Sequence, residues 1–564
     1  MIQAVTPAIV RALTAATRWA AGLAPGWTVV RSRGVGLLGF SFWYCLASFS
    51  LGCSPAPSRP GRIILVSMDT VRSDRITRDV GTSIMPTLAA IASEGVWLEN
   101  FYAASSYTLP SHMSIFSGLD AAEHGMSRDE AELNPSVTTL AQALADAGYR
   151  GVGLHEGANV AARFGFARGF ESYRELRRLD VVGRALPALL EWLHEAGDEP
   201  YFLFLHTYAA HFPYGGFERY RAEVPERGLP SDQQIARLRE EYASAHSRRK
   251  EGRADAEIPA ETRRLCTLYN QLSERHGQLL GCGDYYLPAD FAASRHGASD
   301  LRALLASYDE RIRQIDRVLL ALRDTLVELG QWDDTLLVVT ADHGEAFLEH
   351  ASSQHDYIPF NEVFKVPAVI SYPALLRDAP VHELQGLTWQ LDLMPTILGL
   401  AGARIPPGAR GTDLSAILEG RETLPRDRAI FPAVLRLAHR EARPLRRLVV
   451  RGDLKFIEGD AHFGDEEGLL FDLKRDPGER HNLREERPDA FRELAALAHS
   501  YAAGLDPRPP IHQTTGRLLP MDPLRSVPVV DLSQGQAAAL RELGYLNTEP
   551  SSGPGARGGA GERD

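Results

Sequence analysis

Runs of apolar residues recur along the chain and end at polar positions. The first run covers residues 63–68 and is followed directly by Asp69 and Thr70. An uninterrupted apolar run of this kind is typical of a parallel strand that is buried on both faces. We therefore expect parallel strands at residues 63–68, 151–154, 201–205, 335–340 and 368–371.

Segments with helical spacing of apolar residues lie between these runs, at residues 85–91, 138–147 and 301–329. Strands that alternate with helices indicate an α/β fold built on a doubly wound, mostly parallel sheet. Such sheets bind ligands at the carboxyl ends of their strands. Polar residues that directly follow a predicted strand are therefore the first candidates for function.

Two regions break the alternation. Residues 215–300 are charged, with Arg-rich and Glu-rich runs, and we interpret them as a surface insertion in a catalytic domain that spans residues 61–428. Residues 429–548 are expected to form a smaller C-terminal α+β subdomain, and the Gly-, Ser- and Pro-rich residues 549–564 a disordered tail. Antiparallel strands are predicted in the subdomain at residues 448–450, 454–457 and 469–472.

The N-terminal part contains an uncharged apolar stretch at residues 34–52, preceded by Arg31 and Arg33. A basic flank followed by such a stretch indicates an export signal, and the length of the stretch approaches that of a membrane-spanning helix. We interpret residues 34–60 as a signal or anchor segment with a Pro-rich linker. Cys53 follows a sequence that loosely resembles a lipobox, which makes it a candidate for lipid attachment.

This interpretation predicts an exported protein of the cell envelope, anchored in the membrane or attached to it as a lipoprotein. The alternative is a buried helix of the catalytic domain, against which the Pro-rich stretch argues. Residues 1–33 precede the signal and form an N-terminal extension whose place in the mature protein the sequence leaves open.

Charge and cysteine content exclude several classes of protein. The chain has 61 basic and 73 acidic residues and a net charge of -12. Nucleic acid is therefore not expected as a partner, because binding to phosphate backbones requires clustered Lys and Arg. Four cysteines without a CxxC pair argue against a zinc ribbon or a redox dithiol. Cys266 and Cys282 are compatible with a disulfide and equally with two free thiols.

Candidate catalytic and metal-binding residues lie in three segments, at or beyond the ends of predicted strands. They contain Asp69, then Thr108 and His112 at the opening of a helix that runs on to residue 117, then the pair Asp342-His343. Carboxylates combined with an imidazole suit Zn, Mn or Fe, and a divalent ion activates a neighbouring hydroxyl. A helix N-terminus also favours an alkoxide and an anionic ester. Each segment alone is an ordinary cap or loop, but the three together indicate a site.

The same segments resemble the sulfatase family, within the alkaline phosphatase superfamily. The resemblance runs from about residue 62 to 546, apart from the insertion. It is carried by ILVSMDTVRSD, ASSYTLPSHMSIFSGL, FLHTYAAHFPY, LLVVTADHGEAFLEH and FDLKRDPGERHNL. It implies the α/β fold of that superfamily, with a smaller C-terminal subdomain, and the activity of a metal-dependent ester hydrolase.

The resemblance also implies roles for individual residues. His211 matches a histidine that contacts the ester or protonates its leaving group, and His206 and His355 are candidates for binding the anionic substrate. These two histidines are equally compatible with satisfied structural positions. Thr108 occupies the nucleophile position. One divalent metal ion (Mn, Zn or Fe favoured, Ca or Mg also compatible) would be held by Asp69, Thr108, Asp342 and His343.

The chain departs from the usual family pattern at the nucleophile. Sulfatases typically carry Cys or Ser, then x-Pro-Ser-Arg, and convert the first residue to formylglycine. Thr108 cannot be converted to an aldehyde by that route, so no formylglycine is expected. His112 replaces the arginine that normally steadies the nucleophile, which makes it a catalytic candidate. Thr70 and His343 also depart from the pattern, and the set Asp-Thr-Asp-His resembles the phosphoryl and phosphonate branch more than the sulfate branch.

The sequence therefore predicts a hydrolase of sulfate, phosphate or phosphonate esters, with phosphorus esters favoured. One alternative keeps the fold and moves a phosphoryl-alcohol group onto a lipid or glycan at a membrane surface. A second alternative is a catalytically silent protein that binds anions. The joint retention of Asp69, Thr108, Asp342 and His343 argues against the silent protein.

Overall fold

The computed structural model describes residues 59–128, 130–176, 186–211, 298–347, 349–350, 353–355, 358–434, 445–459 and 467–519. Nearly all of the predicted signal or anchor segment and of the predicted insertion lie outside these ranges, as do the predicted tail and all four cysteines. Export and lipid attachment therefore remain predictions. None of the described helices is long and apolar enough to cross a bilayer.

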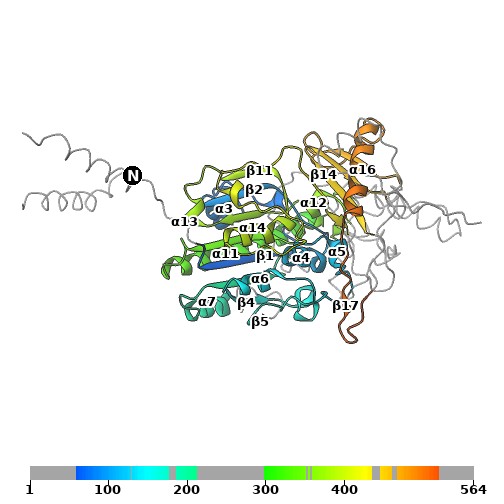
Figure 1. Ribbon diagram of the computed structural model, residues 1–564. Helices are drawn as coiled ribbons and strands as arrows, with labels where there is room; N and C mark the ends of the chain where they lie inside the picture. Colours follow the sequence, from blue (N-terminus) through cyan, green and yellow to red (C-terminus); the bar gives the residue numbers. More distant parts are fainter. Residues whose placement is uncertain are drawn as a thin grey trace, which may run out of the picture. The chain divides into compact units, whose positions relative to one another are not determined.

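An eight-stranded sheet forms the centre of the described part (Figure 1). Strand β10 runs antiparallel to both of its neighbours, and all other neighbouring strands are parallel. In order across the sheet the strands are β11 (Glu383–Trp389), β2 (Gly95–Tyr102), β10 (Ala368–Ser371), β7 (Thr335–Ala341), β1 (Arg62–Met68), β6 (Tyr201–Thr207), β4 (Arg150–His155) and β5 (Ser172–Glu175).

Helices cover both faces of this sheet. In one group, α3 (Pro86–Ala92) and α7 (Leu186–Glu195) both pack against α11 (Ala298–Glu328). The other group is α4 (Thr108–Ser117), α6 (Leu140–Asp146) and α14 (Leu393–Leu400). Every residue of β1, β6 and β7 is buried between them. The predicted doubly wound, mostly parallel α/β fold is therefore confirmed, and its continuous apolar runs are the central strands.

The predicted strands correspond to β1, β4, β6, β7 and β10, with ends that differ by at most two residues. Strand β2 was not predicted, because its sequence GVWLENFY contains two polar residues in succession. Strand β11 was missed for a similar reason. It lies at the edge of the sheet and most of its residues are only half-buried or exposed.

A second, antiparallel sheet forms the C-terminal part and contains β12 (Ala429–Ile430), β13 (Ala433–Val434), β14 (Arg446–Arg451), β15 (Leu454–Ile457) and β16 (Leu469–Asp472). Helix α16 (Pro488–Ala503) packs against β14 (Figure 1). The antiparallel strands predicted for this region are therefore present. Beyond α16 the chain returns to the catalytic domain, where β17 (Ile511–His512) pairs with β3 (Ala131–Glu132).

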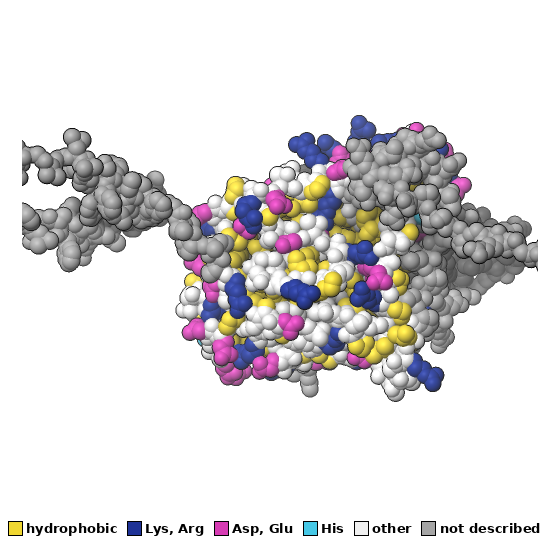
Figure 2. Space-filling model, viewed as in Figure 1, with side chains coloured by type: hydrophobic (Ala, Val, Ile, Leu, Met, Phe, Trp, Pro, Cys, Tyr) yellow, Lys and Arg dark blue, Asp and Glu magenta, His cyan; other side chains and the backbone are white. Residues whose placement is uncertain are grey.

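Shorter elements complete the described part. They are α5 (Ala121–His124), α12 (Asn361–Phe364), α13 (Pro373–Leu376), α15 (Ser415–Leu418), β8 (Ala346–Phe347), β9 (Ser353–Gln354) and the 3-10 turns η1 (Ser73–Arg75), η2 (Ala158–Val160), η3 (Ala162–Phe164) and η7 (Gln390–Asp392). On the face drawn in Figure 2, basic and acidic side chains are interspersed, and neither sign forms a continuous patch.

Candidate metal and nucleophile site

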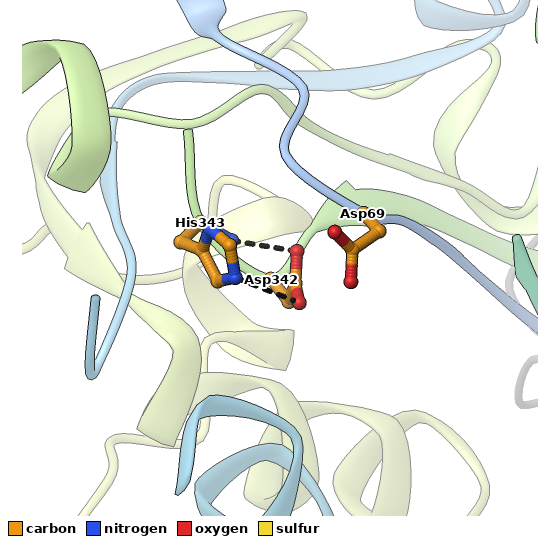
Figure 3. A group of neighbouring side chains, drawn as sticks. All are labelled: Asp69, Asp342 and His343. Atoms are coloured by element: carbon orange, nitrogen blue, oxygen red, sulfur yellow. Dashed lines mark hydrogen bonds and ion pairs between the residues drawn. The ribbon is translucent and has the colours of Figure 1, made fainter. Parts of the chain in front are cut away.

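Two neighbouring strands end side by side at the candidate site. Strands β1 and β7 are parallel and in register, with Met68 opposite Ala341, so that Asp69 and Asp342 follow at the same edge of the sheet. Each of Asp69, Asp342 and His343 offers a ligand atom, and these three atoms lie within 4.8 Å of one another (Figure 3). All three side chains are buried. The register of two parallel strands thus brings together groups that are far apart in the sequence.

Thr108 joins this group from a third direction. It is the first residue of α4, a helix of 10 residues, and its side chain is buried. Its Oγ1 lies 3.2 Å from Asp69 Oδ2 and 3.3 Å from His343 Nε2. The structure therefore brings together all four residues that the sequence nominated as metal ligands.

The backbone around Asp69 is held in an unusual conformation. Thr70 has φ 59°, which is rare for a β-branched residue and costs on the order of 1–3 kcal/mol. In this conformation its backbone N–H donates to Asp342 Oδ1 at 3.2 Å, and the N–H of His343 donates to the same oxygen at 2.8 Å. Tyr308 of α11 donates its hydroxyl to the Thr70 carbonyl at 2.7 Å. The strained turn therefore fixes the orientation of the Asp342 carboxylate.

Two further side chains that the sequence did not nominate support the site. Gln390 donates its amide to the carbonyl oxygens of Ala341 and Asp342 at 2.9 and 2.7 Å, and its Oε1 accepts from the Ala104 N–H at 2.7 Å. Ser111 of α4 places its hydroxyl 2.6 Å from the same Asp342 carbonyl. The end of β7 is thus tied to the first turns of α4 by buried hydrogen bonds.

The protonation of His343 follows from its contacts. Its Nδ1 lies 2.9 Å from the carbonyl oxygen of Gly344, which can only accept, so Nδ1 carries the proton. This arrangement leaves a lone pair on Nε2, the atom that faces Thr108. Burial lowers the pKa of His343 well below its usual value, which favours the neutral imidazole that metal ions bind.

The carboxylates of Asp69 and Asp342 repel each other when both are ionised, and a cation would stabilise them. Asp69 Oδ1 and Asp342 Oδ2 are buried without a hydrogen-bond partner among the described residues. Burial raises the pKa of Asp69 to about 7, and burial together with the neighbouring Asp69 raises the pKa of Asp342 well above its usual value. Two ionised carboxylates at this separation require a compensating positive charge. Orphaned oxygens beside a neutral imidazole are the donor set of a divalent metal ion.

His112 and His206 lie behind the nucleophile. His112 donates from Nδ1 to the Thr108 carbonyl at 2.9 Å and accepts at Nε2 from the Ser67 hydroxyl at 2.8 Å. Its ring therefore braces the first turn of α4. His206, on β6, lies with Nε2 3.7 Å from Asp69 Oδ2 and with its ring centroid 4.9 Å from that of His112. Both side chains are buried.

His355 lies against His343, and His211 lies against His355. The ring of His355 is 4.2 Å from that of His343 and 5.5 Å from that of His211, between centroids. Glu345 was not nominated from the sequence, although it follows Asp342-His343-Gly344 closely. Its buried carboxylate lies with Oε1 3.4 Å from His355 Nδ1. His112 and His206 thus lie next to the two aspartates, and the ring of His355 contacts those of both His343 and His211.

Comparison with protein families supports this geometry. Residues 62–403 match the family model described as Sulfatase, which is more than half of the chain. Residues 337–499 match a second model, described as N-sulphoglucosamine sulphohydrolase, C-terminal. The first match contains all four residues of the site. The second contains the whole antiparallel sheet and most of α16.

Curated relatives match over different lengths. The chain is 28% identical to the multifunctional alkaline phosphatase superfamily protein PehA of Trinickia caryophylli over 322 residues, which are 56% of each chain. It is 21% identical to N-acetylglucosamine-6-O-sulfatase of Bacteroides thetaiotaomicron over 499 residues, 78% of this chain and 86% of the relative. The match to PehA thus spans little more than half of that relative.

Solved structures share the fold. The phosphonate monoester hydrolase of Agrobacterium radiobacter superposes with a TM-score of 0.58 at 20% identity, covering 79% of this chain and 94% of the hydrolase. BT4656, solved in complex with its substrate D-glucosamine-2-N,6-O-disulfate, gives a TM-score of 0.57 at 19% identity, covering 79% of this chain and 98% of that chain. The family match and the shared fold agree with the motifs, and the chain belongs to the sulfatase family.

Proposed function

We propose that the protein is a metal-dependent ester hydrolase that uses Thr108 as its nucleophile and prefers phosphorus esters to sulfate esters. One observation carries this proposal. The Thr108 hydroxyl lies within 3.3 Å of both Asp69 and His343, at the start of a helix and beside buried carboxylate oxygens that lack partners among the described residues. A threonine that served only as a helix cap would not require this surrounding set of ligand atoms.

The residues that would hold the metal are Asp69, Asp342 and His343, with Thr108 as a fourth ligand. Mixed carboxylate and imidazole ligands favour Mn, Zn or Fe over Ca or Mg. When bound, a divalent ion would neutralise charge on the ester and lower the pKa of the nucleophile.

The chain's own groups prepare Thr108 for attack. Its hydroxyl donates toward Asp69 Oδ2, and the lone pair of His343 Nε2 lies at a similar distance. His112 fixes the carbonyl of the same residue, so that the nucleophile and the helix turn are held as one unit. The position at the N-terminus of α4 stabilises negative charge on the transferred group.

The reaction divides into two displacements. The Thr108 hydroxyl gives its proton to Asp69 Oδ2, to which it donates a hydrogen bond, as its oxygen forms a bond to phosphorus. The bond from phosphorus to the departing alcohol oxygen breaks, and His211 donates a proton to that oxygen. In the second displacement water gives a proton to the now neutral His211 as its oxygen bonds to phosphorus, the bond from phosphorus to Thr108 Oγ1 breaks, and Asp69 returns the proton to Thr108. His355 lies beside His343 and His206 lies beside Asp69, and both would contact the anionic oxygens of the ester.

Two considerations favour phosphorus over sulfur. Thr108 cannot supply the hydrated aldehyde of a formylglycine sulfatase, and His343 replaces the asparagine that is usual in that branch. PehA carries the description of a multifunctional alkaline phosphatase superfamily protein, and one of the structures that share the fold is a phosphonate monoester hydrolase.

Parallel assays test the proposal. The wild-type protein, Thr108→Ala and the control Thr335→Ala would be assayed with 4-nitrophenyl sulfate, 4-nitrophenyl phosphate, bis(4-nitrophenyl) phosphate and 4-nitrophenyl phenylphosphonate. Each protein would first be stripped with a chelator and reconstituted with Mn, Zn, Fe, Ca or Mg. Thr335 is a suitable control because it is a buried threonine at the opposite end of β7, with its hydroxyl bonded to the Gln331 carbonyl at 2.8 Å.

We expect phosphorus esters to be hydrolysed faster than the sulfate ester. Thr108→Ala should lower kcat by at least about 10³-fold, the scale seen when a nucleophile is removed, while Thr335→Ala retains activity. A sulfatase rate that exceeds the others would overturn the substrate preference. Full activity of Thr108→Ala would overturn the nucleophile.

A further inference from the structure

Glu156 is a buried carboxylate that the proposed reaction leaves unexplained. It directly follows β4, the neighbour of β6, so it lies at the same edge of the sheet as Asp69. Its side chain is 3% exposed. A carboxylate buried at this edge is expected to have a specific polar role, because burial of a charge without strong hydrogen bonds is costly.

Glu156 contacts the segment that begins at the end of β6. The backbone N–H of Tyr208 donates to Glu156 Oε2 at 2.6 Å, and the Thr207 hydroxyl lies 3.4 Å from the same oxygen. That hydroxyl also accepts from the Ala209 N–H at 3.0 Å. A hydrogen bond from a backbone N–H to a charged oxygen is among the stronger kinds in proteins. The carboxylate therefore fixes the direction in which the chain leaves β6.

Tyr208 connects Glu156 to His211 through its backbone and its ring. The N–H of His211 donates to the Tyr208 carbonyl at 2.9 Å, which closes a turn, and the two rings meet edge to face with centroids 5.6 Å apart. The phenol oxygen of Tyr208 accepts from the Asn159 N–H at 3.1 Å. Tyr208 is thus held at its backbone by Glu156 and at its phenol by the segment just beyond Glu156.

We infer that Glu156 is a positioning residue for the leaving-group acid: through the Tyr208 amide it sets the turn that presents His211 to the departing oxygen. This inference rests on the proposed function, since it takes His211 as that acid. A proton donor must lie within hydrogen-bond reach of the departing oxygen, and a displacement of about 1 Å lowers rates on the order of 10²-fold. Glu156 can act on catalysis in this way without itself contacting the substrate.

A leaving-group comparison separates this role from a structural one. The 4-nitrophenyl and phenyl esters of phenylphosphonate share the group that is transferred, but phenoxide is the poorer leaving group and depends more on protonation. Both esters would be assayed with the metal-reconstituted wild type, His211→Ala, Glu156→Gln and the double variant. Glu175→Gln is the matched control, because Glu175 ends the neighbouring strand β5, pairs in register with His155 and is exposed.

For the phenyl ester we expect Glu156→Gln to lower kcat by about 10- to 100-fold, and His211→Ala by about 10²- to 10⁴-fold. For the 4-nitrophenyl ester both losses should shrink to less than about tenfold, with KM little changed. The double variant should be no worse than His211→Ala, because Glu156 acts through that side chain. Glu175→Gln should behave as the wild type.

The possible failures are distinguishable. If Glu156→Gln slows both esters equally, or if its effect adds fully to that of His211→Ala, Glu156 does not act through His211 and the inference is wrong. If His211→Ala itself shows no dependence on the leaving group, the acid has been assigned incorrectly and the proposed mechanism loses that step. A lowered melting temperature of Glu156→Gln with unchanged kcat for both esters would assign Glu156 to stability alone.

Discussion

Two buried carboxylate sites in this protein differ in how their charge is compensated. At the junction with the C-terminal sheet, Asp120 receives two hydrogen bonds from the Arg447 guanidinium, at 2.8 and 3.2 Å. The Tyr501 hydroxyl and the Ala122 N–H also donate to it, at 3.1 and 2.8 Å. Both oxygens of Asp120 are therefore occupied by donors from the chain itself.

Among the described residues, the pair Asp69 and Asp342 forms no ion pair with an arginine or lysine comparable to that of Asp120. The side chains beside the pair include the imidazoles of His206 and His343 and the Thr108 hydroxyl. Each carboxylate keeps one buried oxygen without a hydrogen-bond partner in the described part of the chain. Breaking a buried ion pair strongly destabilises the folded state, whereas removing one of two charges that repel each other stabilises it. Asp120 is therefore compensated within the chain, whereas Asp69 and Asp342 repel each other and would be stabilised by the cation that we propose they bind.

The largest expected effect is that of Asp342→Asn. This change removes one metal ligand and one of the two negative charges that would compensate the cation. Bound metal should therefore fall well below one per chain, and kcat/KM should fall by at least about 10³-fold. Without metal, the same variant should be at least as stable as the wild type, because one uncompensated buried charge has gone. Metal analysis, assays and thermal melts in chelator measure the three quantities.

Asp120 provides the matched control for that experiment. Both aspartates are buried, both are changed to asparagine, and only one belongs to the candidate site. If Asp342→Asn binds a full equivalent of metal, or if it melts well below the metal-free wild type, the carboxylate has a structural role and the comparison fails.

The second expected effect concerns Asp120→Asn itself. The change leaves the buried Arg447 guanidinium without its counter-ion, which should lower the free energy of unfolding by about 3 kcal/mol. Urea denaturation measures the loss. Metal content and kcat of the folded fraction should stay at wild-type levels. A variant that keeps its stability but loses metal would reverse the assignment of the two sites.

The fold was largely predictable from the sequence, because its central strands are buried on both faces. Continuous apolar runs identified β1 and β7, and the polar residue after each run identified Asp69 and Asp342. The same rule extends to Glu156, which lies two residues beyond the predicted strand at residues 151–154. Strand β2 escaped prediction because Glu99 and Asn100 interrupt its pattern.

Other parts of the site could not have been found without tertiary contacts. Gln390 lies in a 3-10 turn far along the chain, and nothing in its local sequence shows that its amide reaches the carbonyl of Asp342. The metal ligands themselves converge only because β1 and β7 are adjacent and in register. The resemblance of the motifs to the sulfatase family predicted that the three segments meet at one site. The pattern of apolar and polar residues alone predicted only three separate segments.

The smallest expected effect separates the two kinds of carboxylate by pH. Because burial raises the pKa of Asp69 to about 7, from an unfolded value near 3.8, the metal-free native state binds more protons than the unfolded chain between these values. The stability of the metal-free protein should therefore fall as the pH rises from about 5 to about 7, by roughly 2 kcal/mol. Metal-loaded protein should not show this fall, since the cation compensates the ionised carboxylates and binds more tightly as protons leave.

Thermal melts across this range, with chelator and with saturating Mn, measure the two slopes. Asp342→Asn in chelator should reduce the slope, because burial also raises the pKa of Asp342 well above its usual value and the variant loses that proton-linked contribution. Equal slopes with and without metal would mean that no cation resides between Asp69 and Asp342, and the two buried sites would then differ only in their hydrogen bonds.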